Sequence, residues 1–140
     1  MNISDISITS LKKIPVMGGD VWHAMKEKDD GFKGFGEAYF SLVNFKTVKA
    51  WKMHLRMTMN IIVPVGEVKF VFMDNLGEVR EERIGVKNYV RLTIPPRIWF
   101  GFQGISVEHS MLLNIADIQH NPEEVDKKNI EEIEFNWSNK

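Results

Sequence analysis

The feature that most constrains this chain is a succession of short runs rich in aromatic and β-branched side chains, separated by glycine, proline and other turn residues. No run from residue 34 onward has the length and period of a long amphipathic helix. The expected strands cover residues 36–45, 47–55, 58–65, 68–73, 78–86, 89–94, 99–102 and 110–117. Many short strands at near-even spacing predict an all-β fold, a closed double-stranded jelly-roll barrel.

The run at residues 36–45, GEAYFSLVNF, alternates as expected of a strand with one buried face. Its apolar members are Ala38, Phe40 and Leu42, and its polar members are Glu37, Tyr39 and Ser41. Asn114 is a further polar position inside an otherwise apolar run. Polar residues of alternating strands either line a pocket or face outward, and both alternatives stay open for Glu37, Tyr39 and Asn114.

The segment at residues 121–124, Asn-Pro-Glu-Glu, has the pattern of a helix start, with a capping asparagine, proline in the first position and acids in the first turn. We therefore expect a short C-terminal helix. A chain of 140 residues with 44% hydrophobic content can bury a core without a disulfide or a structural metal. The sequence predicts a single domain over residues 1–140.

A net charge of −1 gives no global field that would attract the chain to nucleic acid or to an anionic membrane. We expect neither partner. The chain has no cysteine, which excludes disulfides and thiolate nucleophiles and fits a reducing compartment. It shows no export signal and no apolar run long enough to span a membrane, so a cytoplasmic location is expected.

The stretch WKMHLR at residues 51–56 places a histidine inside an expected strand. Lys52, His54 and Arg56 share one face of this strand because side chains alternate. An inward face of this kind suits an anionic ligand, and histidine is the side chain best placed to move protons near neutral pH. The alternative is a histidine that is exposed or hydrogen-bonded in the core without a function.

The opposite face of the same stretch is apolar and carries Trp51, Met53 and Leu55. If His54 points inward, this face lies on the outside and needs a cover. We therefore expect a homodimer that buries these three side chains.

Other chemistry finds little support in the sequence. The remaining histidines, His23, His109 and His120, are scattered without the paired spacing of metal ligands, so no metal site is expected. There is no serine-nucleophile motif and no glycine-rich phosphate loop. Trp99, in an aromatic group after a double proline, can stack on a base or a sugar, although such residues more often belong to a β core.

Four stretches together resemble the dTDP-4-dehydrorhamnose 3,5-epimerase family of cupin-like jelly rolls, over roughly residues 35–125. They are MHL at 53–55, NIIVPVGEVKFVFMD at 60–74, LTIPPRIWFGF at 92–102 and HNPEE at 120–124. The resemblance implies that His54 is the base that removes a proton beside a ketone of the sugar. It also implies a nucleotide-sugar substrate, a dimer and no cofactor.

The chain departs from the family at most other catalytic positions. The family's lysine falls on Met59, its tyrosine near Leu113 and a further histidine on Phe100, while the aspartate that orients the base falls beyond residue 140. Other groups can substitute: Arg56 or Lys52 as the stabiliser of the enolate oxygen, and Tyr39 or Tyr89 as the acid. We expect the remaining substrate contacts from Glu37, Trp99 and Asn114.

Two functions follow from these observations. The first is a cofactor-independent epimerase or isomerase of 4-keto-deoxyhexose nucleotides, in polysaccharide or lipopolysaccharide biosynthesis, with His54, Arg56 and Tyr39 as catalytic residues. The second is a non-catalytic module of the same fold that binds a nucleotide sugar or a glycan.

Overall fold

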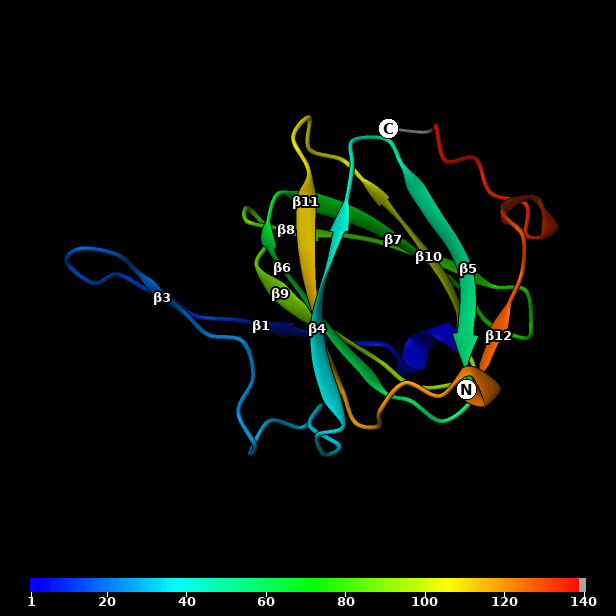
Figure 1. Ribbon diagram of the computed structural model, residues 1–140, viewed down its shortest axis with the longest axis horizontal. Coiled ribbons are helices and arrows are strands. Elements are labelled where there is room, and N and C mark those ends of the chain that lie inside the picture. Colours follow the sequence, from blue (N-terminus) through cyan, green and yellow to red (C-terminus); the bar gives the residue numbers. More distant parts are fainter. Residues whose placement is uncertain (139–140) are drawn as a thin grey trace.

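The computed structural model describes residues 1–138 and shows two five-stranded antiparallel sheets packed face to face (Figure 1). The first sheet has the order β1-β9-β6-β11-β4, with β1 at Ser7–Ser10, β4 at Glu37–Val43, β6 at Met59–Val65, β9 at Val90–Ile94 and β11 at Ser110–Ala116. The second has the order β12-β5-β10-β7-β8, with β5 at Val48–His54, β7 at Glu67–Met73, β8 at Val79–Gly85, β10 at Trp99–Gly104 and β12 at Val125–Lys127. The predicted all-β double-sheet fold is confirmed.

The core lies between the two sheets and explains why the runs form strands. Val68, Phe70 and Phe72 alternate along β7 and are completely buried. Leu92 and Ile94 of β9 meet them from the first sheet within the same cluster. Alternation with a period of two places these side chains on one face of each strand, and their burial against each other holds the sheets together.

The predicted C-terminal α-helix is wrong. Residues Pro122–Glu124 form only a single 3-10 turn, η2, which Asn121 caps by accepting a hydrogen bond from the Glu123 amide at 3.0 Å. The chain then becomes extended, because β12 pairs with β5. Two further 3-10 turns, η1 at Ile3–Asp5 and η3 at Ile130–Glu132, complete the helical content of the described residues, none of which forms a helix that could cross a membrane.

The outer face of the second sheet is covered by the chain itself. Ile133, Phe135 and Trp137 pack against Trp51 of β5 and Val71 of β7, and the rings of Trp51 and Trp137 lie 5.4 Å apart. Trp51 is therefore buried, with 1% of its surface exposed. The C-terminal segment thus covers Trp51, the largest of the three side chains that the predicted dimer was expected to bury.

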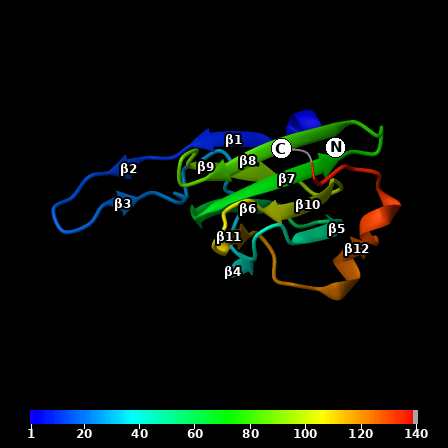
Figure 2. The ribbon, with the colours of Figure 1, turned by 90° about the horizontal axis from the view of Figure 1, so that it is seen from above.

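Two apolar features remain uncovered. The outer face of β4 exposes Phe40 and Leu42, with 65% and 51% of their surface accessible. The apolar set of this strand thus points outward, opposite to the usual arrangement, and its polar set points toward the space between the sheets. The hairpin formed by β2 (Lys13–Ile14) and β3 (Val21–Trp22) projects from the body as an arm (Figures 1 and 2).

Candidate active site

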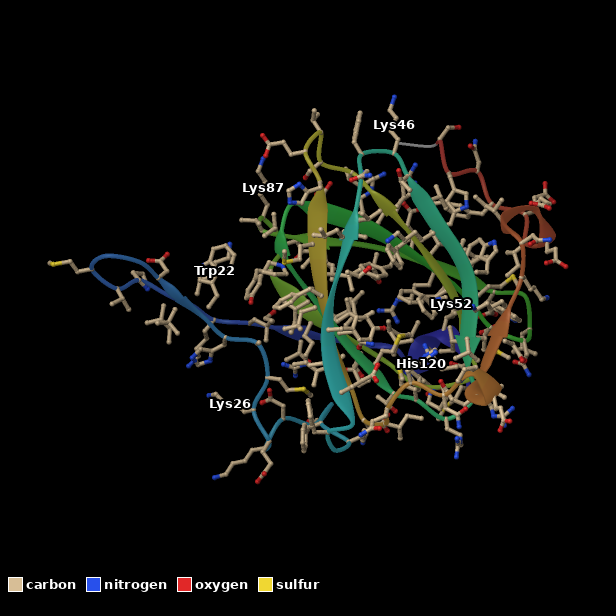
Figure 3. The ribbon with its side chains drawn as sticks, in the orientation of Figure 1. Trp22, Lys26, Lys46, Lys52, Lys87 and His120 are labelled. Atoms are coloured by element: carbon tan, nitrogen blue, oxygen red, sulfur yellow. The ribbon has the colours of Figure 1, made fainter. Side chains whose placement is uncertain are left out.

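A cavity of about 860 Å³ lies between the two sheets and is bordered by the edge strand β4 on one side and by β5 and β12 on the other. Its floor is apolar and consists of Met57, Met59, Ile61, Phe100, Phe102 and Leu112. Its walls carry the polar groups. Glu37, Tyr39, Ser41 and Asn114 come from the first sheet, and Lys49, Lys52, His54 and Lys127 come from the second. Lys52 and His120, which also lines the cavity, are labelled in Figure 3.

His54 is the last residue of β5 and is held by a buried carboxylate. Its Nδ1 lies 2.5 Å from Oε1 of Glu124, and the two residues are 7% and 2% exposed. The other carboxylate oxygen accepts hydrogen bonds from the backbone amides of Arg56 and Met57, each at 3.1 Å. The ring of Phe100 lies nearly parallel to the imidazole, with ring centroids 6.0 Å apart. Glu124 thus fixes the ring in one orientation.

The electrostatics of Glu124 favour a charged carboxylate. Burial raises its pKa, but the hydrogen bonds from His54, Arg56 and Met57 outweigh burial, and the pKa lies below its usual value. A carboxylate on Nδ1 requires a proton on that nitrogen, which leaves the lone pair of neutral His54 on Nε2. Nε2 is therefore the atom that can accept a proton in the cavity.

Four lysines give this wall a positive charge. Lys49, Lys52 and Lys127 of the second sheet line the cavity together with Lys128, just after β12, and among residues 1–138 no carboxylate forms an ion pair with any of them. Burial lowers the pKa of Lys52, and repulsion from Lys127 and Lys49 lowers it further. Lys49 also donates a hydrogen bond from Nζ to the carbonyl oxygen of Leu42 at 2.7 Å, so it spans the space between β5 and β4. Such a cluster suits a multivalent anion.

Tyr39 faces this wall from the first sheet. It is the register partner of Asn114 on β11, and Nδ2 of Asn114 donates a hydrogen bond to the Tyr39 hydroxyl oxygen at 3.1 Å. Glu37, two residues earlier on β4, accepts a hydrogen bond from the His120 amide at 2.7 Å. A proton acceptor and a proton donor are thus available on opposite walls of one cavity.

The fold agrees with comparisons to known proteins, although no protein-family model matches the chain. A dTDP sugar isomerase from Desulfovibrio desulfuricans G20 superposes with a TM-score of 0.90 at 34% identity, over 96% of this chain and 91% of that one. The chain belongs to the dTDP-4-dehydrorhamnose 3,5-epimerase-like family of cupin sugar epimerases and isomerases.

Two more distant proteins are also similar to this chain. A probable low-salt glycan biosynthesis epimerase from Haloferax volcanii is 26% identical over 137 residues, which are 92% of this chain and 88% of the relative. The dTDP-4-dehydrorhamnose 3,5-epimerase of Sulfolobus tokodaii has a TM-score of 0.82 at 19% identity, over 96% of this chain and 84% of that one. The last likeness shows the fold alone.

The structure brings five of the predicted site residues together. Glu37, Tyr39, Lys52, His54 and Asn114 all line the cavity. The apolar replacements at family positions are also in place, because Met59 and Phe100 belong to the cavity floor. Leu113 itself points outward, and its neighbours Leu112 and Asn114 face the cavity instead.

Three predicted site residues lie elsewhere. Strand β5 ends at His54, so the alternation does not extend to Arg56, whose side chain is exposed and whose backbone amide binds Glu124. Tyr89 packs on Trp22 at the base of the arm and donates its hydroxyl to the His23 carbonyl oxygen at 2.8 Å. Trp99 packs into the outer cluster around Trp51, beneath the ammonium group of Lys128. None of the three side chains lines the cavity.

Glu124 is the functional residue that sequence reasoning missed. The resemblance placed the partner of the base beyond the end of the chain, and the structure corrects this by placing Glu124 on His54. The only signal was an acidic residue in the turn HNPEE, 70 positions away in the chain. Among the described residues no group of three or more histidines and carboxylates could hold a metal ion.

Proposed function

We propose that this chain is a cofactor-independent isomerase of nucleoside-diphosphate 4-keto-deoxyhexoses, with His54 as the base. The observation that carries the proposal is the buried His54–Glu124 pair, which directs Nε2 into a cavity between the sheets. A ketone acidifies the neighbouring C–H bond. Nε2 takes this proton, and the electron pair of the C–H bond moves through the carbon–carbon bond to the ketone oxygen, which gives an enolate.

The negative charge of the enolate oxygen needs a nearby cation, and Lys52 is the group proposed to supply it. Arg56, the other candidate, is exposed outside the cavity. Lys52 lies two residues before His54 on the same strand and lines the same wall. Lys49 and Lys127 extend this positive wall and are suited to the diphosphate of a nucleotide sugar.

Tyr39 is proposed as the acid that returns a proton to carbon. It belongs to the opposite sheet, so the proton arrives on the face of the sugar away from His54, and the configuration inverts. Glu37 and Asn114, beside it on the same wall, are proposed contacts for sugar hydroxyl groups. The name of the Haloferax relative supports a place in glycan biosynthesis, as in a polysaccharide or lipopolysaccharide pathway.

The test is proton exchange at carbon. The protein is incubated with dTDP-4-keto-6-deoxyglucose in D₂O, and deuterium incorporation at C3 and C5 is followed by NMR. Exchange that disappears in His54→Asn and persists in His109→Asn supports the proposal, since His109 is exposed and does not line the cavity. Equal deuterium exchange in His54→Asn and in the unchanged protein would contradict the proposal that His54 is the base.

The apolar floor favours a second candidate, a non-catalytic module that binds a nucleotide sugar or a glycan. Met59 and Phe100 replace a lysine and a histidine of the family pattern and can supply neither charge nor protons. Saturable shifts of cavity resonances on titration with dTDP, without any deuterium exchange in a panel of keto sugar nucleotides, would establish this function.

A homodimer stays a prediction, but through a different surface. We propose that a second copy covers the outer face around Phe40 and Leu42, because large exposed apolar patches mark interaction sites. We expect the β2–β3 arm to pack against the same second copy, since an isolated two-stranded hairpin is only marginally stable in water. Light scattering tests this directly: Phe40→Asp is expected to give a monomer, and a monomeric unchanged protein contradicts the proposal.

A further inference from the structure

Asn114 is a buried amide with apolar neighbours on its own strand. It lies between Leu112 and Ala116 on the inward face of β11, which Ser110 also shares, and only 1% of its surface is exposed. Its one side-chain hydrogen bond among the described residues goes from Nδ2 to the hydroxyl oxygen of Tyr39, at 3.1 Å. Asn114 and Tyr39 are also direct register partners, so the contact joins two neighbouring strands of the cavity wall.

Stability alone does not explain an asparagine at this position. Its carbonyl oxygen Oδ1 is buried and has no hydrogen-bond partner in the part of the chain that the structure describes. A buried polar atom without a partner destabilises the folded state, and a leucine at this position would avoid that penalty. The amide therefore points to a function, and Tyr39 is the group on which it acts.

The direction of the hydrogen bond determines what Tyr39 can do. A hydroxyl whose oxygen accepts a hydrogen bond keeps its own hydrogen available for another acceptor. With the Asn114 amide on one side of the oxygen, that hydrogen turns away from β11. The tether also restricts rotation of a side chain that is otherwise 41% exposed.

We propose that Asn114 is the positioning residue of Tyr39: it orients the hydroxyl as a proton donor facing His54 across the cavity. The inference rests on the proposed isomerase function and deepens it. Once Nε2 of His54 has taken the proton from carbon, the Tyr39 O–H bond breaks and its proton forms a new C–H bond on the opposite face. The electrons of the enolate form this bond, and the ketone is restored. The Asn114 N–H stabilises the tyrosinate until it regains a proton from water, and His54 releases the proton it took to water.

This arrangement differs from what the family resemblance implies. The resemblance places a tyrosine on the strand of Leu113, whereas here the tyrosine stands on β4 and the neighbouring strand β11 supplies only the amide. The acid has thus moved by one strand, and Asn114 brings its hydroxyl back toward β11.

The kinetic test separates enolisation from inversion. In D₂O, His54-dependent exchange and formation of the inverted product are measured in parallel for Tyr39→Phe, Asn114→Leu and the double variant. We expect Tyr39→Phe to slow inversion about 100-fold, as for loss of a general acid, while exchange changes less than about threefold. Asn114→Leu alone is expected to slow inversion about 10-fold. In the Tyr39→Phe background, the same substitution is expected to slow inversion by less than a further twofold. An equal loss in both backgrounds would overturn the proposal, because Asn114 would then act independently of Tyr39.

A second test needs no activity. The chain has two tyrosines, so ¹³Cζ-tyrosine labelling gives two signals, which Tyr89→Phe assigns. Asn114→Leu should move the Tyr39 signal and leave that of Tyr89 unchanged, whereas Ser41→Ala, at the next inward position of β4, should move neither. An unmoved Tyr39 signal refutes the contact whether or not the protein is an enzyme. A moved signal without exchange in the unchanged protein refutes the isomerase function and the acid role with it.

Discussion

The two sheets hold their functional side chains in different ways. In the second sheet His54 is almost completely buried and bound to Glu124, and the C-terminal segment covers the outer face. In the first sheet Tyr39 is 41% exposed, accepts a hydrogen bond of 3.1 Å from the Asn114 side chain, and stands on a strand whose outer face is bare around Phe40. In the proposed mechanism, the base is therefore held more firmly than the acid, which has a single hydrogen bond to Asn114. Such a site can keep one proton-abstracting group while the acid side adapts to the sugar.

The largest expected effect comes from removing what fixes the base. Glu124→Ala leaves the His54 ring and two backbone amides without their buried acceptor. We expect deuterium exchange to fall at least about 100-fold, which is about 2.7 kcal/mol in the barrier. Glu123→Ala, on the exposed neighbour, is the matched control. Unchanged exchange in Glu124→Ala would show that His54 needs no orienting group.

Removing the cover of the second sheet should cost stability. Trp137→Ala takes away a ring packed on Trp51 and Phe135 and is expected to lower the free energy of unfolding by about 2–3 kcal/mol. Phe40→Ser, on the bare face, should change it by less than about 0.5 kcal/mol in the monomer. Urea denaturation measures both. Equal losses would mean that the two outer faces are covered alike in solution.

The positive wall should determine affinity for the nucleotide. Lys52→Met and Lys127→Met each remove one cation from the second-sheet wall and should weaken dTDP binding about 10-fold in calorimetry, with an effect that shrinks as salt rises. Ser41→Ala on the opposite wall should change binding less than about twofold. A loss in Ser41→Ala as large as in the lysine variants would place the anion on the first sheet.

The smallest effect is on pH dependence. Because the folded-state pKa of Glu124 lies below the ordinary value of 4.5, the carboxylate stabilises the fold above about that pH, and this contribution is lost as pH falls further through the folded-state pKa. The unchanged protein should therefore be more stable than Glu124→Gln at pH 5. This difference in the free energy of unfolding should disappear as pH falls below the folded-state pKa of Glu124, and urea unfolding at a series of pH values measures it. A difference that stays constant with pH would show that Glu124 is not linked to folding.

Local pattern was sufficient to predict eight of the strands and the place of His54 in the cavity wall. The alternation around His54 and the turn residues after each run are properties of neighbouring residues, and the structure confirms the strands they predict. The strands β1, β2, β3 and β12 carried no comparable pattern and were not predicted. The placement of the Arg56 side chain on the same face as His54 was wrong, because the alternation was extended past the end of β5. Pairing with β10 and β12 determines where that strand ends.

Contacts between distant segments could not be read from the sequence. Glu124 meets His54 only because η2 leads into β12, which pairs antiparallel with β5. The polar face of β4 had two possible directions, and the choice depends on which sheet face opposes it. Tyr89 was assigned to the site from strand parity alone, whereas it packs on Trp22 and binds the His23 carbonyl oxygen outside the cavity.

The C-terminal segment also gives the protein its own optical reporter. The chain has four tryptophans, and three of them lie in one cluster on the outer face of the second sheet: Trp51, Trp99 and Trp137. Trp22 is apart on the arm, so Trp22→Phe leaves emission that comes from this cluster alone. Its wavelength then reports whether the segment is docked on the second sheet, whose other face lines the cavity.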